Sequence, residues 1–176
     1  MRKNLCLNNL KNTILINRGL YTEEKICDYY TVKDNVGDGM VLCNESKVST
    51  TTKEFWKTGK IILTKLSNYL HYLSTKKIGL IKLDVEGAEE KVIKSGIELI
   101  KEIHVPFITA EYNQKLFKEQ DTNPSEFIKL FLDNGYKMSD SGFFPTEYRS
   151  LEYILRKNGL FNLFFVHKDF ISKNKM

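Results

Sequence analysis

Three charged side chains recur at every second position of the segment IKLDVEGAEE, which spans residues 81–90: Lys82, Asp84 and Glu86. In a β-strand this spacing directs all three to one face, with the apolar side chains between them on the other. Charges cost free energy to bury unless they are paired, and Lys82 is a ready partner on that face. A lysine among carboxylates can hold them ionised, or can itself bind an anionic or hydroxyl-bearing ligand.

A second acidic strand end follows further along the chain. The segment FITAEYN, residues 107–113, ends with Glu111 and Asn113. In open α/β sheets, ligands bind beyond the carboxyl ends of the strands. If the two strands are neighbours in the sheet, their carboxylates lie side by side at one crevice.

The same residues allow two other interpretations. Asp84 or Glu86 would instead cap the helix that follows, and Gly87 would only permit the tight turn between strand and helix. Alternatively, the protein would bind a divalent metal or a phosphate through Asp84, Glu86 and Glu111. No other cluster of ligand residue types in the sequence supports this last interpretation.

The hydrophobic pattern predicts the elements that position these residues. Helices are predicted over residues 1–12, 66–73, 88–103 with an interruption at Gly96, 123–135 and 147–157. Strands are predicted over residues 14–16, 29–32, 40–43, 78–85, 105–112, 136–139 and 160–167, with Asp38-Gly39 as a hairpin turn and 44–60 as a loop. From residue 61 onward strands alternate with helices, which predicts an α/β fold with a mostly parallel sheet, in a single domain of residues 1–176.

The composition is that of an ordinary globular protein, with 41% hydrophobic and 28% charged residues in a chain of 176. The net charge of +5 is not gathered into a basic stripe, so no nucleic-acid partner is expected. No apolar run approaches the roughly 18 to 20 residues of a membrane span, and the N-terminus has no signal-peptide core, which predicts a cytoplasmic protein without a membrane partner. The wide spacing of Cys6, Cys27 and Cys43 predicts free, reduced thiols. The oligomeric state is left open.

The segment IGLIKLDVEGAEEKVIKSG, residues 78–96, resembles the signature segment of the FkbM-type methyltransferases. The residues that match the family's motif are Lys82, Asp84, Glu86, Gly87, Glu89 and Gly96. Weaker resemblance runs from NNLKNTILINRGL through VPFITAEYN to DNGYKM. It therefore covers nearly the whole chain.

The resemblance implies a Rossmann-like class I methyltransferase fold that transfers a methyl group from S-adenosylmethionine, by the family's pattern to a hydroxyl oxygen of a small molecule or glycan. Asp84 and Glu111 would be the catalytic carboxylates, which deprotonate the acceptor hydroxyl or only orient it. The other residues implied by the resemblance are Lys82, Glu86 and Asn113 for the acceptor, and Asn17 and Gly87 for the cofactor, with no metal ligand.

The chain departs from the family pattern at its N-terminal end. The family begins with a strand, a Gly-rich turn and a helix that hold the cofactor, and a second strand then ends in a ribose-binding Glu. The segment MRKNLCLNNLKN resembles the helix after that second strand. We therefore expect an N-terminally truncated fold that binds S-adenosylmethionine weakly on its own. A non-catalytic pseudoenzyme or interaction module with the same sheet is the alternative.

The family's strand order, 3-2-1-4-5-7-6 with the last strand antiparallel, leads to an expectation about topology. Residues 13–17 would be strand three and residues 78–85 strand four, with two empty strand positions between them. Strand 78–85 would then have an unpaired edge, either open or covered by the N-terminal segment or a second chain. Lys82 is expected within ion-pairing reach of Asp84, Glu86 or Glu111.

Overall fold

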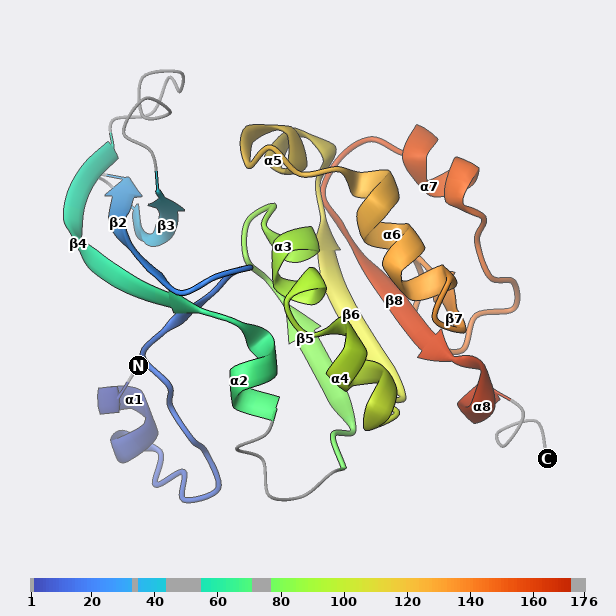
Figure 1. Ribbon diagram of the computed structural model, residues 1–176, viewed down its shortest axis with the longest axis horizontal. Coiled ribbons are helices and arrows are strands. Elements are labelled where there is room, and N and C mark those ends of the chain that lie inside the picture. The colour runs from blue at the N-terminus through green and yellow to red at the C-terminus, as the bar shows by residue number, and fades with distance from the viewer. Residues whose placement is uncertain (1, 33–34, 44–54, 71–76, 172–176) are drawn as a thin grey trace.

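The computed structural model describes residues 2–32, 35–43, 55–70 and 77–171, and its strands form two four-stranded sheets (Figure 1). The order in the N-terminal sheet is β1 (Gly19–Leu20), β4 (Phe55–Thr64), β2 (Lys25–Val32) and β3 (Asn35–Leu42). The order in the C-terminal sheet is β5 (Leu80–Leu83), β6 (Phe107–Tyr112), β8 (Phe161–His167) and β7 (Tyr136–Ser139). The described helices are α1 (Arg2–Leu7), α2 (Leu66–Leu70), α3 (Glu89–Lys94), α4 (Ile97–Glu102), α5 (Gln114–Glu119), α6 (Pro124–Leu132), α7 (Leu151–Arg156) and α8 (Lys168–Ile171).

The C-terminal sheet has the order that the resemblance implies for the last four strands. β5 runs parallel to β6, and β8 runs antiparallel to both β6 and β7. The prediction of a mostly parallel sheet is wrong. β8 runs against both of its neighbours, and the N-terminal sheet is built on the antiparallel pairs β2–β3 and β2–β4. The described chain is a mixed α/β fold.

The main apolar core lies on one face of the C-terminal sheet. Figure 1 shows α3, α4 and α6 laid across that face. Burial alternates along β6: Ile108, Ala110 and Tyr112 are fully buried, and the side chains between them are partly exposed. Ile93 of α3 and Phe127 of α6 belong to the same buried cluster. Since strand side chains alternate between faces, Glu111 lies on the opposite, partly exposed face of β6.

The edge of β5 that faces away from β6 has no strand partner among the described residues. This confirms the expected unpaired edge on the strand that carries Lys82. Leu80, at the start of the strand, is 52% exposed, which is consistent with its place on an edge strand.

Two predicted signals, at Gly96 and Asn123, mark helix boundaries, whereas the helices predicted over residues 1–12 and 147–157 are shorter, at Arg2–Leu7 and Leu151–Arg156. The interruption at Gly96 separates α3 from α4 because α2 docks there: the Leu66 N–H donates to the Ser95 hydroxyl at 2.9 Å, and the Leu66 side chain fills the space of a Cβ on Gly96. Asn123 caps α6, its side-chain oxygen accepting the Ser125 N–H at 2.9 Å. Among the described helices, none has the length and apolar character needed to cross a membrane.

The strand predicted over residues 14–16 is wrong. No strand is assigned there, and Ile14 is 80% exposed. The first strand is instead β1, which pairs in parallel with the end of β4. Residues 13–17 therefore do not supply strand three, and no described strand of the C-terminal sheet comes from the first 60 residues.

Two further predictions in this half of the chain are corrected. The Asp38-Gly39 pair lies inside β3, with Gly39 opposite Thr31, so it is not the predicted hairpin turn, and residues 33–34 between the two strands lie outside the described residues. In the predicted loop 44–60, residues 44–54 lie outside the described part, and residues 55–60 belong to β4. This stretch of β4 is polar because most of its side chains face solvent, while its backbone pairs with β2.

Cys27 and Cys43 form a disulfide, so the prediction of free thiols is wrong for these two residues. The β2–β3 register, in which Asp28 lies opposite Leu42, continues to place Cys27 opposite Cys43. Pairing across a hairpin joins residues 16 positions apart, which wide spacing alone does not reveal. Cys6 is free and exposed.

Removing this disulfide is expected to destabilise the protein by about 3 kcal/mol, because the bond limits the freedom of a loop of about 15 residues in the unfolded chain. The Cys27→Ser/Cys43→Ser variant should melt at a lower temperature than the unsubstituted protein, and a reductant should lower only the melting temperature of the latter. Cys6→Ser is the matched control and should leave the temperature unchanged. Equal melting of all three proteins would contradict a structural disulfide.

Candidate functional site

Parallel pairing of β5 and β6 brings the two acidic strand ends together. The register places Leu83 beside Ala110, so Asp84 and Glu111 are the next pair along the strands. Carboxylate oxygens of Asp84, Glu86 and Glu111 lie within 4.8 Å of one another. The crevice expected from the two strand ends is therefore present.

Lys82 neutralises part of this charge. Its Nζ lies 2.6 Å from Oδ2 of Asp84, which confirms the expected ion pair and raises the pKa of Lys82. Burial raises the pKa of Glu111, and the charge of Asp84 raises it further, while Lys82 opposes the shift. Glu111 is thus a carboxylate whose proton affinity is increased by its surroundings.

Asp84 does not cap the helix that follows, because α3 begins after Ala88, where no side-chain cap hydrogen bond forms, and Asp84 pairs with Lys82. The carboxylate of Glu89 instead accepts the Val85 N–H at 3.2 Å and ties the helix back to the strand end.

Asn113 does act as a helix cap. Its side-chain oxygen accepts the Lys115 N–H at 3.0 Å at the start of α5. This oxygen is engaged in the local structure, so any contact of Asn113 with a ligand falls to its side-chain amide group.

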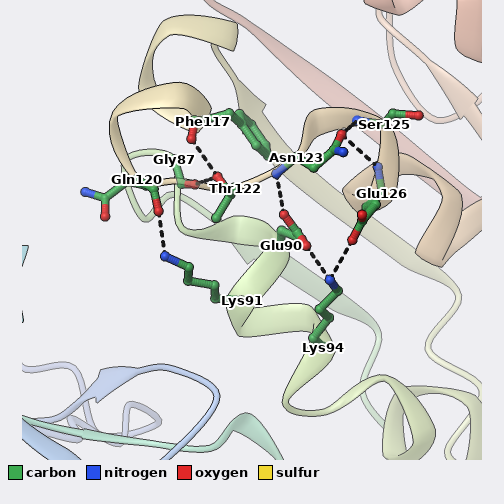
Figure 2. Close-up of polar contacts among 10 residues, drawn as sticks. All are labelled: Gly87, Glu90, Lys91, Lys94, Phe117, Gln120, Thr122, Asn123, Ser125 and Glu126. Atoms are coloured by element: carbon green, nitrogen blue, oxygen red, sulfur yellow. Dashed lines mark hydrogen bonds and ion pairs between the residues drawn. The ribbon is translucent and has the colours of Figure 1, made fainter.

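At Gly87, the turn between β5 and α3 lies directly against Leu116 of α5. Its φ is +91°, and a Cβ at this position would stand 2.4 Å from the carbonyl oxygen of Leu116. The Thr122 hydroxyl donates to the Gly87 carbonyl at 2.7 Å (Figure 2). Glycine is required for both the backbone angle and the close approach. This contact sets where the chain carrying Asp84 and Glu86 leaves the strand.

Charged contacts hold α3 against the start of α6, as Figure 2 shows. The buried Glu90 carboxylate accepts the Asn123 N–H at 2.5 Å. Lys94 forms ion pairs with Glu90 and with Glu126, the second at 2.8 Å. These groups satisfy one another, so they belong to the scaffold of the turn and leave the crevice to other residues.

A cleft of about 420 Å³ lies between the acidic strand end and the N-terminal sheet. Its lining includes Asp84 and Glu86 on one side, and Leu20, Tyr21, Lys25 and Lys91 among the remaining residues. The volume is within the range of small-molecule sites. Asn17 is exposed and is absent from the lining. A hollow of about 460 Å³ beside α4 includes none of the three crevice carboxylates.

Sequence reasoning missed Tyr21, Lys25 and Lys91. They come from three separate segments, before β2, at the start of β2 and in α3. No spacing rule connects such positions, because only the packing of the N-terminal sheet against the end of β5 brings them to one cleft.

A family model described as "Methyltransferase FkbM domain" matches residues 2–138. The chain belongs to this family. The match includes β5 and β6 and so the whole acidic crevice of this FkbM domain, and it ends within β7. No curated protein and no solved structure gives a significant match.

Gly87→Ala should destabilise the FkbM domain by more than about 2 kcal/mol, because the new Cβ adds a clash with Leu116 to the roughly 1–2 kcal/mol cost of a left-handed alanine. Gly159→Ala is the matched control. Gly159 has φ +98° but no atom within 4 Å of its Cβ position, so its substitution should cost only the conformational part. Urea unfolding of both variants measures the difference. Equal losses would show that the close approach contributes nothing.

Glu89 makes the stability of the domain depend on pH. It is 1% exposed, and burial raises its pKa to about 7, with backbone hydrogen bonds opposing the shift and the charge of Glu111 adding to it. The folded state therefore keeps a proton that the unfolded chain loses above a pKa of 4.5. The stabilisation is fully present below pH 4.5 and is lost as the pH rises through about 7.

Between these limits the contribution of Glu89 should fall by about 3 kcal/mol, at about 1.4 kcal/mol per pKa unit. The measurement is urea unfolding at several pH values for the unsubstituted protein and Glu89→Gln. The variant should gain stability relative to the parent as the pH rises. Glu98→Gln, at an exposed position, is the control and should follow the parent. Parallel curves for parent and Glu89→Gln would contradict the shift.

Proposed function

We propose that this FkbM domain transfers a methyl group from S-adenosylmethionine to a hydroxyl oxygen of a small-molecule or glycan acceptor. The observation that carries the proposal is the pair Asp84 and Glu111 at adjacent strand ends, with Asp84 also lining the cleft. Family membership supports the methyltransferase class. The proposal that the acceptor atom is a hydroxyl oxygen is based on the carboxylates of Asp84 and Glu111.

Glu111 is proposed as the general base. A base works best when its pKa approaches the working pH, and the pKa of Glu111 is raised by burial and by Asp84. Asp84 is held by Lys82 at 2.6 Å, so it has a fixed position from which to accept a hydrogen bond from the acceptor hydroxyl. Lys82 and Glu86 complete the acceptor side of the crevice.

The cleft suits the methyl donor in its charge and its volume. S-adenosylmethionine supplies a methyl group on a cationic sulfur. Asp84 and Glu86 offer carboxylates to such a cation, and Leu20 and Val85 offer apolar surface in the same cleft of about 420 Å³. Gly87 would act by shaping the adjoining turn, since its Cα faces the Leu116 carbonyl.

The test is transfer of radiolabelled methyl from S-adenosylmethionine to a panel of neutral and acidic monosaccharides. Glu111→Gln should lower kcat by about 10²–10⁴-fold, the usual contribution of a general base, and should remove the fall in rate at low pH. Asp84→Asn should lower the rate while the melting temperature changes little. Glu98→Gln, which alters an exposed glutamate on α4, is the matched control.

Unchanged turnover in both crevice variants would contradict the assigned roles. Absence of both methyl transfer and S-adenosylmethionine binding would favour the alternative, a non-catalytic interaction module. The observation behind this alternative is the unpaired edge of β5 among the described strands, which can accept a further strand.

A further inference from the structure

The cleft beside the acidic crevice has a basic wall that the methyl transfer does not use. Tyr21, Lys25 and Lys91 line it, and the two lysines are opposite in charge to Asp84 and Glu86. All three are partly buried. Charges of one sign that gather in a partly enclosed cleft attract an ion of the other sign.

Tyr21 organises the two lysines. Its N–H donates to the Thr64 carbonyl at 2.8 Å, which extends the pairing of β1 with β4 and fixes the residue. The Nζ of Lys25 lies 4.0 Å from the centroid of the Tyr21 ring, and the Nζ of Lys91 lies 5.3 Å from it. The aromatic ring attracts cations, so both ammonium groups are held near Tyr21.

The ammonium group of Lys91 has N–H donors available for a ligand. Its Nζ donates to the Gln120 carbonyl at 2.5 Å, as Figure 2 shows, and an ammonium group has three N–H donors. Within the described part of the chain, no ion pair joins Lys91 to a carboxylate. One turn along the same helix, Lys94 forms ion pairs with both Glu90 and Glu126. The two lysines of α3 therefore differ in what they leave for a ligand.

Lys25 can also exchange its partner. It pairs with Glu23 at 3.0 Å, and the side chain of Glu23 is 64% exposed. Exposed pairs of this kind contribute only about 0–1 kcal/mol. An anion in the cleft would compete with Glu23 at little cost.

We propose that the cleft binds a hydroxyl-bearing molecule that also carries a carboxylate or phosphate group, with Lys25 and Lys91 holding the anion beside Tyr21. This rests on the proposed function in one respect, namely that the bound molecule is the methyl acceptor. Its hydroxyl would then lie toward Asp84 and its anionic group toward the lysines. Lysines act as point charges and accept either anion, so acidic sugars of both kinds belong to the class.

The experiment measures binding of glucuronate, glucose 6-phosphate and glucose to the protein by calorimetry or ligand-observed NMR, without a methyl donor. Glucuronate or glucose 6-phosphate should bind at least tenfold more tightly than glucose, and the stronger of the two identifies the preferred anion. Lys91→Met and Lys25→Met should each weaken binding of the acidic sugar about tenfold and leave binding of glucose unchanged. Lys91→Arg should retain most of the affinity.

Lys129→Met, at an exposed position on α6, is the control and should bind like the parent. If Lys91→Met fails to fold, Lys25→Met still tests whether the lysines of the cleft bind the anionic group. Equal binding of all three sugars, or acidic-sugar binding unaffected by both variants, would overturn the proposal. A separate titration with S-adenosylmethionine would also overturn the proposal if the two lysine variants lost affinity for the donor and not for the acidic sugars. The lysines would then serve the donor. Since binding is measured without the donor, failure of methyl transfer does not affect this result.

Discussion

The close backbone contact between Gly87 and Leu116 is the constraint on which the site depends. A Cβ at Gly87 would stand 2.4 Å from the Leu116 carbonyl oxygen, so any side chain there would force the turn and α5 apart. The contact sets the turn at which β5 becomes α3. Asp84 and Glu86 precede that turn, and Lys91 follows it one helical turn later. The Gly87 turn therefore positions the cleft residues that come from β5 and α3, while Tyr21 and Lys25 come from the N-terminal sheet.

Charge pairing divides the surrounding residues between scaffold and site. Glu90, Lys94 and Glu126 neutralise one another where α3 meets α6, and Glu90 also accepts the Asn123 N–H. In the crevice, the carboxylates of Asp84, Glu86 and Glu111 lie close to one another, and Lys82 pairs with Asp84. Like charges that lie close together repel one another, and the charge of Asp84 raises the pKa of Glu111.

Much of the C-terminal half follows from local patterns. The period-two charges of β5, the break at Gly96 and the cap at Asn123 each depend on residues within a few positions of one another, and the structure places them as predicted. Local patterns predicted the N-terminal half less well. Ile14 lies in an apolar run and yet is 80% exposed, whereas residues 55–60 resemble a loop in sequence and yet pair with β2. Ladder pairing with a distant strand overrides weak local preference in such segments.

The sequence by itself determined which acidic residues stand at the end of β5, because alternation along a strand and the turn at Gly87 direct Asp84 and Glu86 to its carboxyl end. It also indicated the family through the same segment. Only the tertiary structure decided that Cys27 meets Cys43 and that Lys25 and Lys91 line one cleft. These depend on contacts between residues far apart in the chain, and their energies are absent from any short stretch of sequence.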